Sequence, residues 1–236
     1  MMCGLTSGAV ANQSHGAIVA EVQSHLGLED AGCDLESGGP EYTETMGAAY
    51  PVQRKFTFQE YLKLERAALT KSEYVDGEIF AMAGGTAEHD SINVNLLVLL
   101  QNQLKGGRCR ARSADLRVAV SKQGPSFYPD VSVICGDPQF LDGRRDCVLN
   151  PAVVIEVQSR STRRYDRETK VVRYQQIPSL RHIVLVSQRT VAVEHYFRMA
   201  DGSWEVQKLD NLASTLELRT LPASLLLADI YDGLSL

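Results

Sequence analysis

Two acidic residues of this sequence stand in apolar runs, where a carboxylate needs a partner. Glu156 interrupts the run "AVVIEVQS" of residues 152–159, and Asp130 follows Pro129 at the start of a run that ends at residue 135. A carboxylate buried in a sheet without a partner is strongly destabilising, so Glu156 requires a cation, a metal ion or a proton. If the two runs are neighbouring strands, both carboxylates meet at one sheet edge. They would then offer Mg²⁺ two hard oxygen ligands and leave positions for water and phosphate.

A basic partner for Glu156 stands in the charged segment that follows it. Asp166, Lys170 and Tyr174 are four residues apart, so they share one face of a helix, and a helix that returns over the sheet can turn this face toward Glu156. The same spacing is typical of a surface Asp–Lys ion pair worth about 0.3–0.5 kcal/mol, which on spacing alone is the more frequent arrangement. Asp130 by itself is equally well explained as a turn residue. These residues therefore predict a site only if the fold brings them together.

The elements before this region are marked by caps and turns. Thr57 and Glu60 have the spacing of a capping box, which opens a short helix. Asp76-Gly77 predicts a hairpin, and Thr86 is placed to cap a second helix, whose apolar residues recur at helical spacing as far as residue 104.

The order of the remaining elements indicates the class of fold. Apolar runs predict strands at 108–120, 130–135, 152–159 and 182–187, with a helix at 165–176 between the last two. A second hairpin turns at Asp201-Gly202, and an apolar segment at 220–231 closes the chain. This order predicts an α/β sheet with helices packed on it.

Composition limits the class of protein. The 236 residues are 44% hydrophobic with a net charge of -5, which suits one packed domain and argues against a surface coated with positive charge. Because the start of the chain is rich in Gly, Ser, Ala and Glu, we predict a flexible extension at 1–45 and one domain at 46–236. No apolar run approaches the roughly 20 residues that span a bilayer, so we expect a cytoplasmic protein without a membrane partner. The five cysteines lack the spacing of a metal site and are expected to be reduced thiols.

From about Met46 to Leu236 the sequence resembles the Uma-two family of restriction-type endonucleases, members of the PD-(D/E)XK nuclease superfamily. The resemblance rests on "SEYVDGEIFAMAGGTAEH", "SADLRVAV", "YPDVSVICG", "VVIEVQSRSTRRYDRETKVVRYQQIPSLRHIVLV" and "LLLADIY", which occur in the family's order. It implies an α/β, restriction-endonuclease-like core of helix, three strands, helix and strand. An N-terminal helix and hairpin and a C-terminal hairpin would be added to this core.

The resemblance also implies roles for particular residues. Asp130 and Glu156 match the two metal-binding acids, for Mg²⁺ with Mn²⁺ as a substitute. Gln158 stands where the superfamily has a lysine, and Lys170 on the next helix matches the lysine that substitutes for it in the Uma-two family. These four residues are the catalytic candidates.

Further positions are expected around these four, each with a plainer alternative. Asp115 would lie beside the site or pair with an arginine, and His89, which matches the family together with Asn93, is better explained as a capping or packing residue. Gly84 and Gly85 suit a plain turn more than a phosphate site. Candidate supporting residues are therefore Asp115, His89, Asp166 and Tyr174.

The resulting expectation is an Mg²⁺-dependent endonuclease that hydrolyses DNA and acts as a homodimer. Arg160, Arg163 and Arg164, directly after Glu156, would contact DNA phosphates. The alternative is an inactive nuclease fold that serves as a DNA-binding or assembly module, in which Glu156 and Lys170 form a buried ion pair. Gln158 and the acidic net charge favour that alternative.

Overall fold

A computed structural model describes residues 54–82 and 84–235 of the chain. Residues Phe56–Leu236 form one compact unit. The extension expected at 1–45 lies outside the described residues, as do the first residues of the domain expected at 46–236. No helix in the described ranges is long and apolar enough to cross a membrane.

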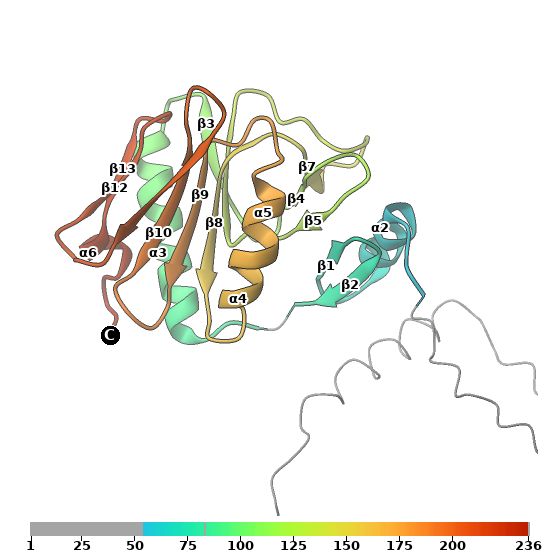
Figure 1. The fold of residues 1–236 in the computed structure, drawn as a ribbon, viewed down its shortest axis with the longest axis horizontal. Helices are drawn as coiled ribbons and strands as arrows, with labels where there is room; N and C mark the ends of the chain where they lie inside the picture. Colours follow the sequence, from blue (N-terminus) through green and yellow to red (C-terminus); the bar gives the residue numbers. More distant parts are fainter. Residues whose placement is uncertain (1–53, 83, 236) are drawn as a thin grey trace, which may run out of the picture. The chain divides into compact units, whose positions relative to one another are not determined.

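The centre of the unit is a six-stranded sheet (Figure 1). Its order is β11 (Trp204–Leu209), β10 (Val193–Arg198), β9 (His182–Ser187), β8 (Pro151–Gln158), β6 (Val131–Cys135) and β3 (Cys109–Ser113). All neighbours are antiparallel except β8 and β9, which are parallel. A parallel pair requires a crossover connection, and the helical segment between β8 and β9 supplies it.

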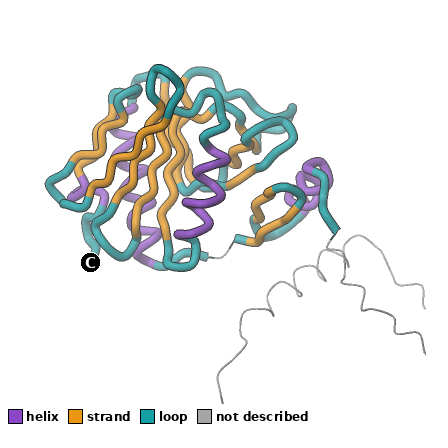
Figure 2. Tube along the Cα trace, in the orientation of Figure 1, coloured by secondary structure: helices purple, strands orange, loops and turns teal. Residues whose placement is uncertain are grey.

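Helices cover both faces of this sheet (Figure 2). Helix α3 (Ala87–Leu104), capped by the Thr86 side chain, packs on the face that carries Val153, Ile155 and Val157. The opposite face carries Val154 and is covered by the crossover helix, which consists of α4 (Arg163–Tyr165), the π-helical segment η1 (Asp166–Lys170) and α5 (Val171–Tyr174). Alternate side chains of β8 therefore pack into two separate hydrophobic cores, one on each face of the sheet.

The order α3, β3, β6, β8, crossover helix and β9 confirms the predicted core of helix, three strands, helix and strand. The added elements are also present. Helix α2 (Phe58–Ala67) begins with the predicted Thr57–Glu60 capping box, and β1 (Ser72–Val75) and β2 (Glu78–Ala81) form the first hairpin. Strands β10 and β11 form the second hairpin.

One predicted strand is wrong in its extent. The segment 108–120 is divided into β3 and β4 (Arg117–Ala119), which belong to different sheets. A turn at Ala114 and Asp115, closed by the Leu116 N–H donating to the Ser113 carbonyl at 3.2 Å, redirects the chain. Ser and Asp favour such turns through local hydrogen bonding, a signal that the apolar residues on either side obscured.

The second sheet has the order β2, β1, β5 (Ser126–Phe127), β4 and β7 (Cys147–Val148). The apolar segment at the end of the chain is also divided, into β13 (Ala223–Leu226) and the short helix α6 (Leu227–Ile230), and β13 pairs with β12 (Thr215–Leu218). The second sheet matters for function because β1 carries an acidic residue to the candidate site.

The expectation that all cysteines are reduced thiols is wrong for one pair. Cys109 and Cys135 lie directly opposite each other on β3 and β6 and form a disulfide. Cys147 is free and buried, and the other two cysteines lie outside the described residues. Two thiols 26 residues apart can be recognised as partners only after the register of the two strands is known.

Candidate active site

The candidate site is a cavity of about 460 Å³ at the end of β8, where the start of β6, the N-terminus of α3, strand β1 and the crossover helix also reach. Its lining includes Glu73, Asp130, Glu156, Asp166 and Lys170. Strands β6 and β8 are neighbours, as the two-acid hypothesis required. The cavity therefore collects side chains from both sheets and both covering helices.

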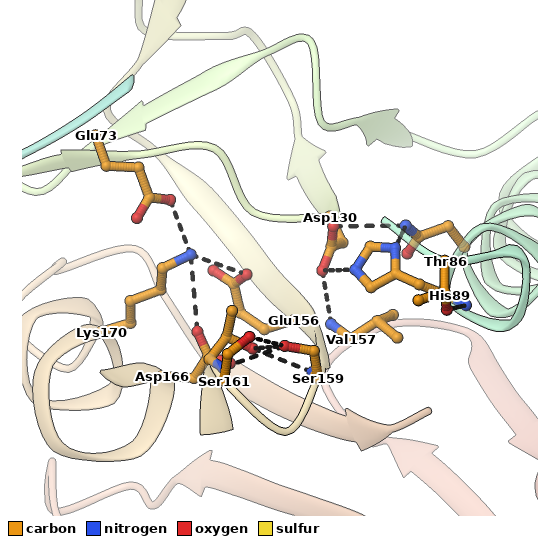
Figure 3. A network of polar contacts seen from close by, with 12 residues as sticks. Glu73, Thr86, His89, Asp130, Glu156, Val157, Ser159, Ser161, Asp166 and Lys170 are labelled. Atoms are coloured by element: carbon orange, nitrogen blue, oxygen red, sulfur yellow. Dashed lines mark hydrogen bonds and ion pairs between the residues drawn. The ribbon is translucent and has the colours of Figure 1, made fainter. Parts of the chain in front are cut away.

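Lys170 is the centre of a buried charge cluster (Figure 3). Its Nζ lies 2.8 Å from Glu73 Oε1, 3.2 Å from Glu156 Oε2 and 3.9 Å from Asp166 Oδ1. The Tyr174 hydroxyl donates to the other oxygen of Glu156, Oε1, at 2.7 Å. The surface-pair interpretation of the Asp166–Lys170 spacing is therefore wrong, because both side chains are buried and turned toward Glu156.

The π-helical segment explains how the crossover helix presents these residues. Asp166 and Lys170 are its first and last residues, both buried, while Glu168 between them is exposed. A π-segment widens one turn by an extra residue, and such turns recur at functional sites. It joins α4, whose arginines are exposed, to α5, which buries Val171 and Tyr174.

The cluster holds more acidic than basic side chains, and both burial and these charges shift the pKa values of its members. Burial raises the pKa of Glu156 well above its ordinary value, although Lys170 opposes the shift. Burial likewise raises the pKa of Asp166 to about 6, again against Lys170. Burial alone would lower the pKa of Lys170, but Glu156, Glu73 and Asp166 outweigh it and raise the pKa. Lys170 therefore stays positively charged. A second cation in the cavity would stabilise the ionised form of the surrounding carboxylates.

Asp130 is held separately, at the junction of β6, β8 and α3. Its Oδ2 accepts a hydrogen bond from the Val157 N–H at 2.7 Å and lies 3.4 Å from His89 Nε2. Its Oδ1 accepts from Asn93 Nδ2 at 3.4 Å, and the same amide lies 3.1 Å from His89 Nδ1. The hydrogen bond with Asp130 is the main reason that the pKa of His89 is raised. His89 takes part in the cap of α3, as expected, because its N–H donates to Thr86 Oγ1 at 3.3 Å. Its ring has a second contact, with Asp130, that the capping explanation did not include.

The residues present suit a divalent cation such as Mg²⁺. Asp130 and Glu156 line the same cavity, where carboxylates outnumber cationic groups. Within the described ranges no three His, Cys, Asp or Glu side chains are grouped closely enough to enclose an ion. Mg²⁺ does not need such a cage, because it commonly binds one or two carboxylates and completes its shell with water and substrate phosphate. Asp130 and Glu156 are consistent with this mode.

Several predicted site residues lie elsewhere. Asp115 is 85% exposed and pairs with Lys71 at 2.5 Å, so neither of its two expected positions is correct. Gln158 is buried and its Nε2 lies 3.4 Å from the Arg163 carbonyl oxygen. The three arginines predicted to bind phosphate are exposed, and Arg164 is paired with Glu168. Gly84 and Gly85 line the cavity.

Glu73 is the residue that the sequence interpretation missed. It belongs to β1 of the second sheet, is 4% exposed, and also accepts a hydrogen bond from the Tyr128 N–H at 3.2 Å. The signal was available, because Glu73 stands in a short strand beside Tyr74 and Val75, as Glu156 does in its own strand. What the sequence could not indicate was that this strand reaches Lys170.

Comparisons with known proteins identify the family of the chain. The model of the Uma2 family, described as "Putative restriction endonuclease", matches residues 58–228. Two uncharacterised proteins of Synechocystis are similar to this chain. The first is 36% identical over 181 residues, which cover 77% of this chain and 94% of the relative. The second is 35% identical over 153 residues, which cover 65% of this chain and 86% of the relative.

A solved structure shares the fold. It is a crystal structure from Anabaena variabilis described as "a putative nuclease belonging to DUF820", with a TM-score of 0.62 at 19% identity, over 75% of this chain and 97% of the other. This likeness confirms the restriction-endonuclease-like α/β fold, and the family match confirms the resemblance seen in the sequence. The chain belongs to the Uma2 family of restriction-endonuclease-like proteins.

Proposed function

We propose that this protein is a divalent-metal-dependent endonuclease that hydrolyses phosphodiester bonds of DNA. The observation that carries the proposal is the position of the Lys170 ammonium, 3.2 Å from the carboxylate of Glu156, in a cavity that Asp130 also lines. Two acids can hold the metal ion, and a lysine can stabilise the negative charge of the transition state. The family match supports the nuclease class, and the metal ion and the DNA substrate are part of the proposal.

Each residue has a task that follows from its contacts. Asp130 and Glu156 would hold Mg²⁺ or Mn²⁺, which when bound lowers the pKa of a coordinated water and offsets phosphate charge. The Val157 N–H fixes one oxygen of Asp130, so this carboxylate is oriented before substrate arrives. Tyr174 fixes Glu156 in the same way. Lys170 remains charged and therefore would stabilise the negative charge that develops on the phosphate.

A cleavage assay tests this proposal directly. Supercoiled plasmid and single-stranded DNA would be incubated with the full chain, with and without Mg²⁺ or Mn²⁺. We expect cleavage only with metal, and its loss in Asp130→Asn and Glu156→Gln, which replace each charge with an amide of similar size. Lys105→Gln, an exposed lysine outside the cavity, is the control. Equal cleavage by all variants would mean that a contaminant cuts the DNA.

The alternative is an inactive nuclease fold, and the contacts of Glu156 give it specific support. Both oxygens of Glu156 already have donors, Lys170 and Tyr174, so the residue is satisfied without metal. Titration calorimetry with Mn²⁺ separates the two functions. Saturable binding that is lost in Glu156→Ala supports the nuclease, whereas no binding to the folded wild-type chain supports the module.

A further inference from the structure

Two arginines line one cavity beside the candidate site, and they follow the ends of β8 and β9, which are paired in register. The parallel strands pair Gln158 with Ser187, and the Gln188 N–H donates to the Gln158 carbonyl at 3.2 Å, just past the last pair. Arg160 and Arg189 each come two residues after a member of that pair. In α/β sheets, ligands bind outside the carboxyl ends of parallel strands, and both arginines lie there.

The two arginines line a second cavity next to the first. It has a volume of about 380 Å³, and its lining includes Glu88, Arg160, Gln188 and Arg189. Gln188 also lines the candidate active site. The two cavities are therefore neighbours that share one residue, Gln188, so a DNA strand bound in the first would pass close to the second.

The turns that carry the arginines are held by their own hydrogen bonds. The Ser159 N–H donates to Thr162 Oγ1 and the Thr162 N–H donates to Ser159 Oγ, both at 3.1 Å, which closes the loop around Arg160. In the other turn, the Arg189 N–H donates to Ser187 Oγ at 3.3 Å. Both arginines are exposed at the end of these loops. Their backbone is thus fixed while their guanidinium groups face solvent.

The charge balance of the second cavity favours an anion. No ion pair within the described ranges engages Arg160 or Arg189, in contrast to Arg164 and Arg167 on the crossover helix. The lining holds one acid, Glu88, which is exposed, against two arginines. The two arginines leave the lining with a net positive charge, and a guanidinium group binds phosphate through charge-assisted hydrogen bonds.

Gln188 adds a polar atom at the junction of the two cavities. Its Oε1 is buried and has no hydrogen-bond partner in the described part of the chain. A buried acceptor without a donor is uncommon in folded proteins and marks a place where a ligand or water completes the structure.

We infer that the second cavity binds a backbone phosphate of DNA adjacent to the phosphodiester bond that is cleaved, with Arg160 and Arg189 as its ligands. This inference rests on the proposed function. The phosphate contact would add affinity and direct the strand across the first cavity without reading its sequence. Arg189, which lies far from Arg160 in the chain, thereby joins the residues that position the substrate.

Salt-dependent DNA binding tests the inference. Binding of the full chain to a fluorescent duplex would be measured by anisotropy in EDTA, which prevents metal-dependent cleavage, between about 50 and 200 mM salt. The variants are Arg160→Gln, Arg189→Gln and the double variant. Arg144→Gln is the matched control. This substitution removes the same charge, and Arg144 is exposed and lines neither cavity.

Each phosphate contact that is lost should reduce the slope of log K against log salt by about 0.9. We expect this reduction in each single variant and about twice as much in the double variant, with no change in Arg144→Gln. In the cleavage assay the variants should raise KM and leave kcat unchanged at saturating DNA. Slopes equal to that of Arg144→Gln would overturn the second phosphate site while leaving the nuclease intact. A wild-type chain that binds no DNA at all would overturn the proposed function and this inference with it.

Discussion

Lys170 is the residue on which the charge cluster depends. Three carboxylates lie within 3.9 Å of its Nζ, and Lys170 itself is 6% exposed. Removing one partner of a buried ion pair typically costs about 3–5 kcal/mol, because the remaining charge is left uncompensated. We therefore expect Lys170→Met to lower the free energy of unfolding by about this amount in urea titrations without metal. Lys105→Met, at an exposed position, should have little effect.

The same variant should also impair cleavage. Loss of one electrostatic contact to a transition state typically costs about 10²-fold or more in rate. The rate must be measured at low temperature on protein shown to be folded, so that instability is not mistaken for lost catalysis. Wild-type rates in folded Lys170→Met would remove Lys170 from the mechanism.

Gly85 offers a finer test of how His89 positions Asp130. A Cβ atom at residue 85 would lie 2.9 Å from His89 Nδ1 and 3.2 Å from its Cγ, whereas one at residue 84 would have no atom within 4 Å. Gly85→Ala should therefore displace the His89 ring and with it Asp130. We expect cleavage to fall by up to about 10²-fold, the effect of a small misplacement of catalytic groups. Gly84→Ala is the matched control and should cleave normally; equal losses in both would point to the loop instead.

At the scale of elements, β9 and β10 are joined by a buried histidine pair. His182 Nδ1 lies 2.9 Å from His195 Nε2, and His182 Nε2 lies 2.7 Å from the Thr220 hydroxyl. Burial is the main cause that lowers the pKa of each histidine to about 4. Both are neutral in the fold and take up protons more readily when unfolded. Their contribution to stability is complete above pH 6.5 and is lost as the pH falls toward 4.

We expect the midpoint of thermal unfolding to fall across this interval. The ring centroids of His195 and Phe197 are 5.3 Å apart. His195→Phe keeps an aromatic ring at this position, but the new side chain cannot bind a proton. Its melting temperature should therefore depend less steeply on pH between 6.5 and 4 than that of the wild type. An unchanged pH dependence would show that other groups cause the loss of stability in acid.

The crossover helix shows how one element combines several functions. Its inner face carries Asp166, Lys170 and Tyr174 to the site, and α5 also fills the core beside β8 and β9. The loop before it presents Arg160. A change in the π-segment would therefore alter the catalytic groups and the proposed DNA contact together.

At the scale of the whole molecule, the proposed endonuclease has a single candidate active site in the described part of the chain, which raises the question of how it would cut a duplex. Cleavage of both strands with a single site per chain generally requires two chains, and most soluble homo-oligomers are symmetric. We expect a homodimer by light scattering at micromolar concentration. A monomer mass together with efficient double-strand cleavage would contradict this and point to two successive nicks.

The sequence by itself determined what depends on residues a few positions apart. Alternation along residues 152–159 assigned Glu156 to the sheet face opposite Val153, Ile155 and Val157, and a spacing of four placed Asp166, Lys170 and Tyr174 together. The capping box at Thr57 and the hairpin at Asp76-Gly77 were equally local. Periodicity and turn formation depend on residues that are close in the sequence. They can therefore be predicted without knowing how the rest of the chain folds.

Only the tertiary structure decided which distant residues meet. Glu73 reaches Lys170 from the second sheet, and the register of β8 against β9 places Arg160 and Arg189 in the lining of one cavity. The Cys109–Cys135 disulfide and the pairing of Asp115 with Lys71 have the same origin. Strand neighbours and registers follow from the packing of the whole core, to which residues far apart in the chain contribute together, and a shift of one residue exchanges the faces of a strand. No single stretch of the sequence therefore contains that information.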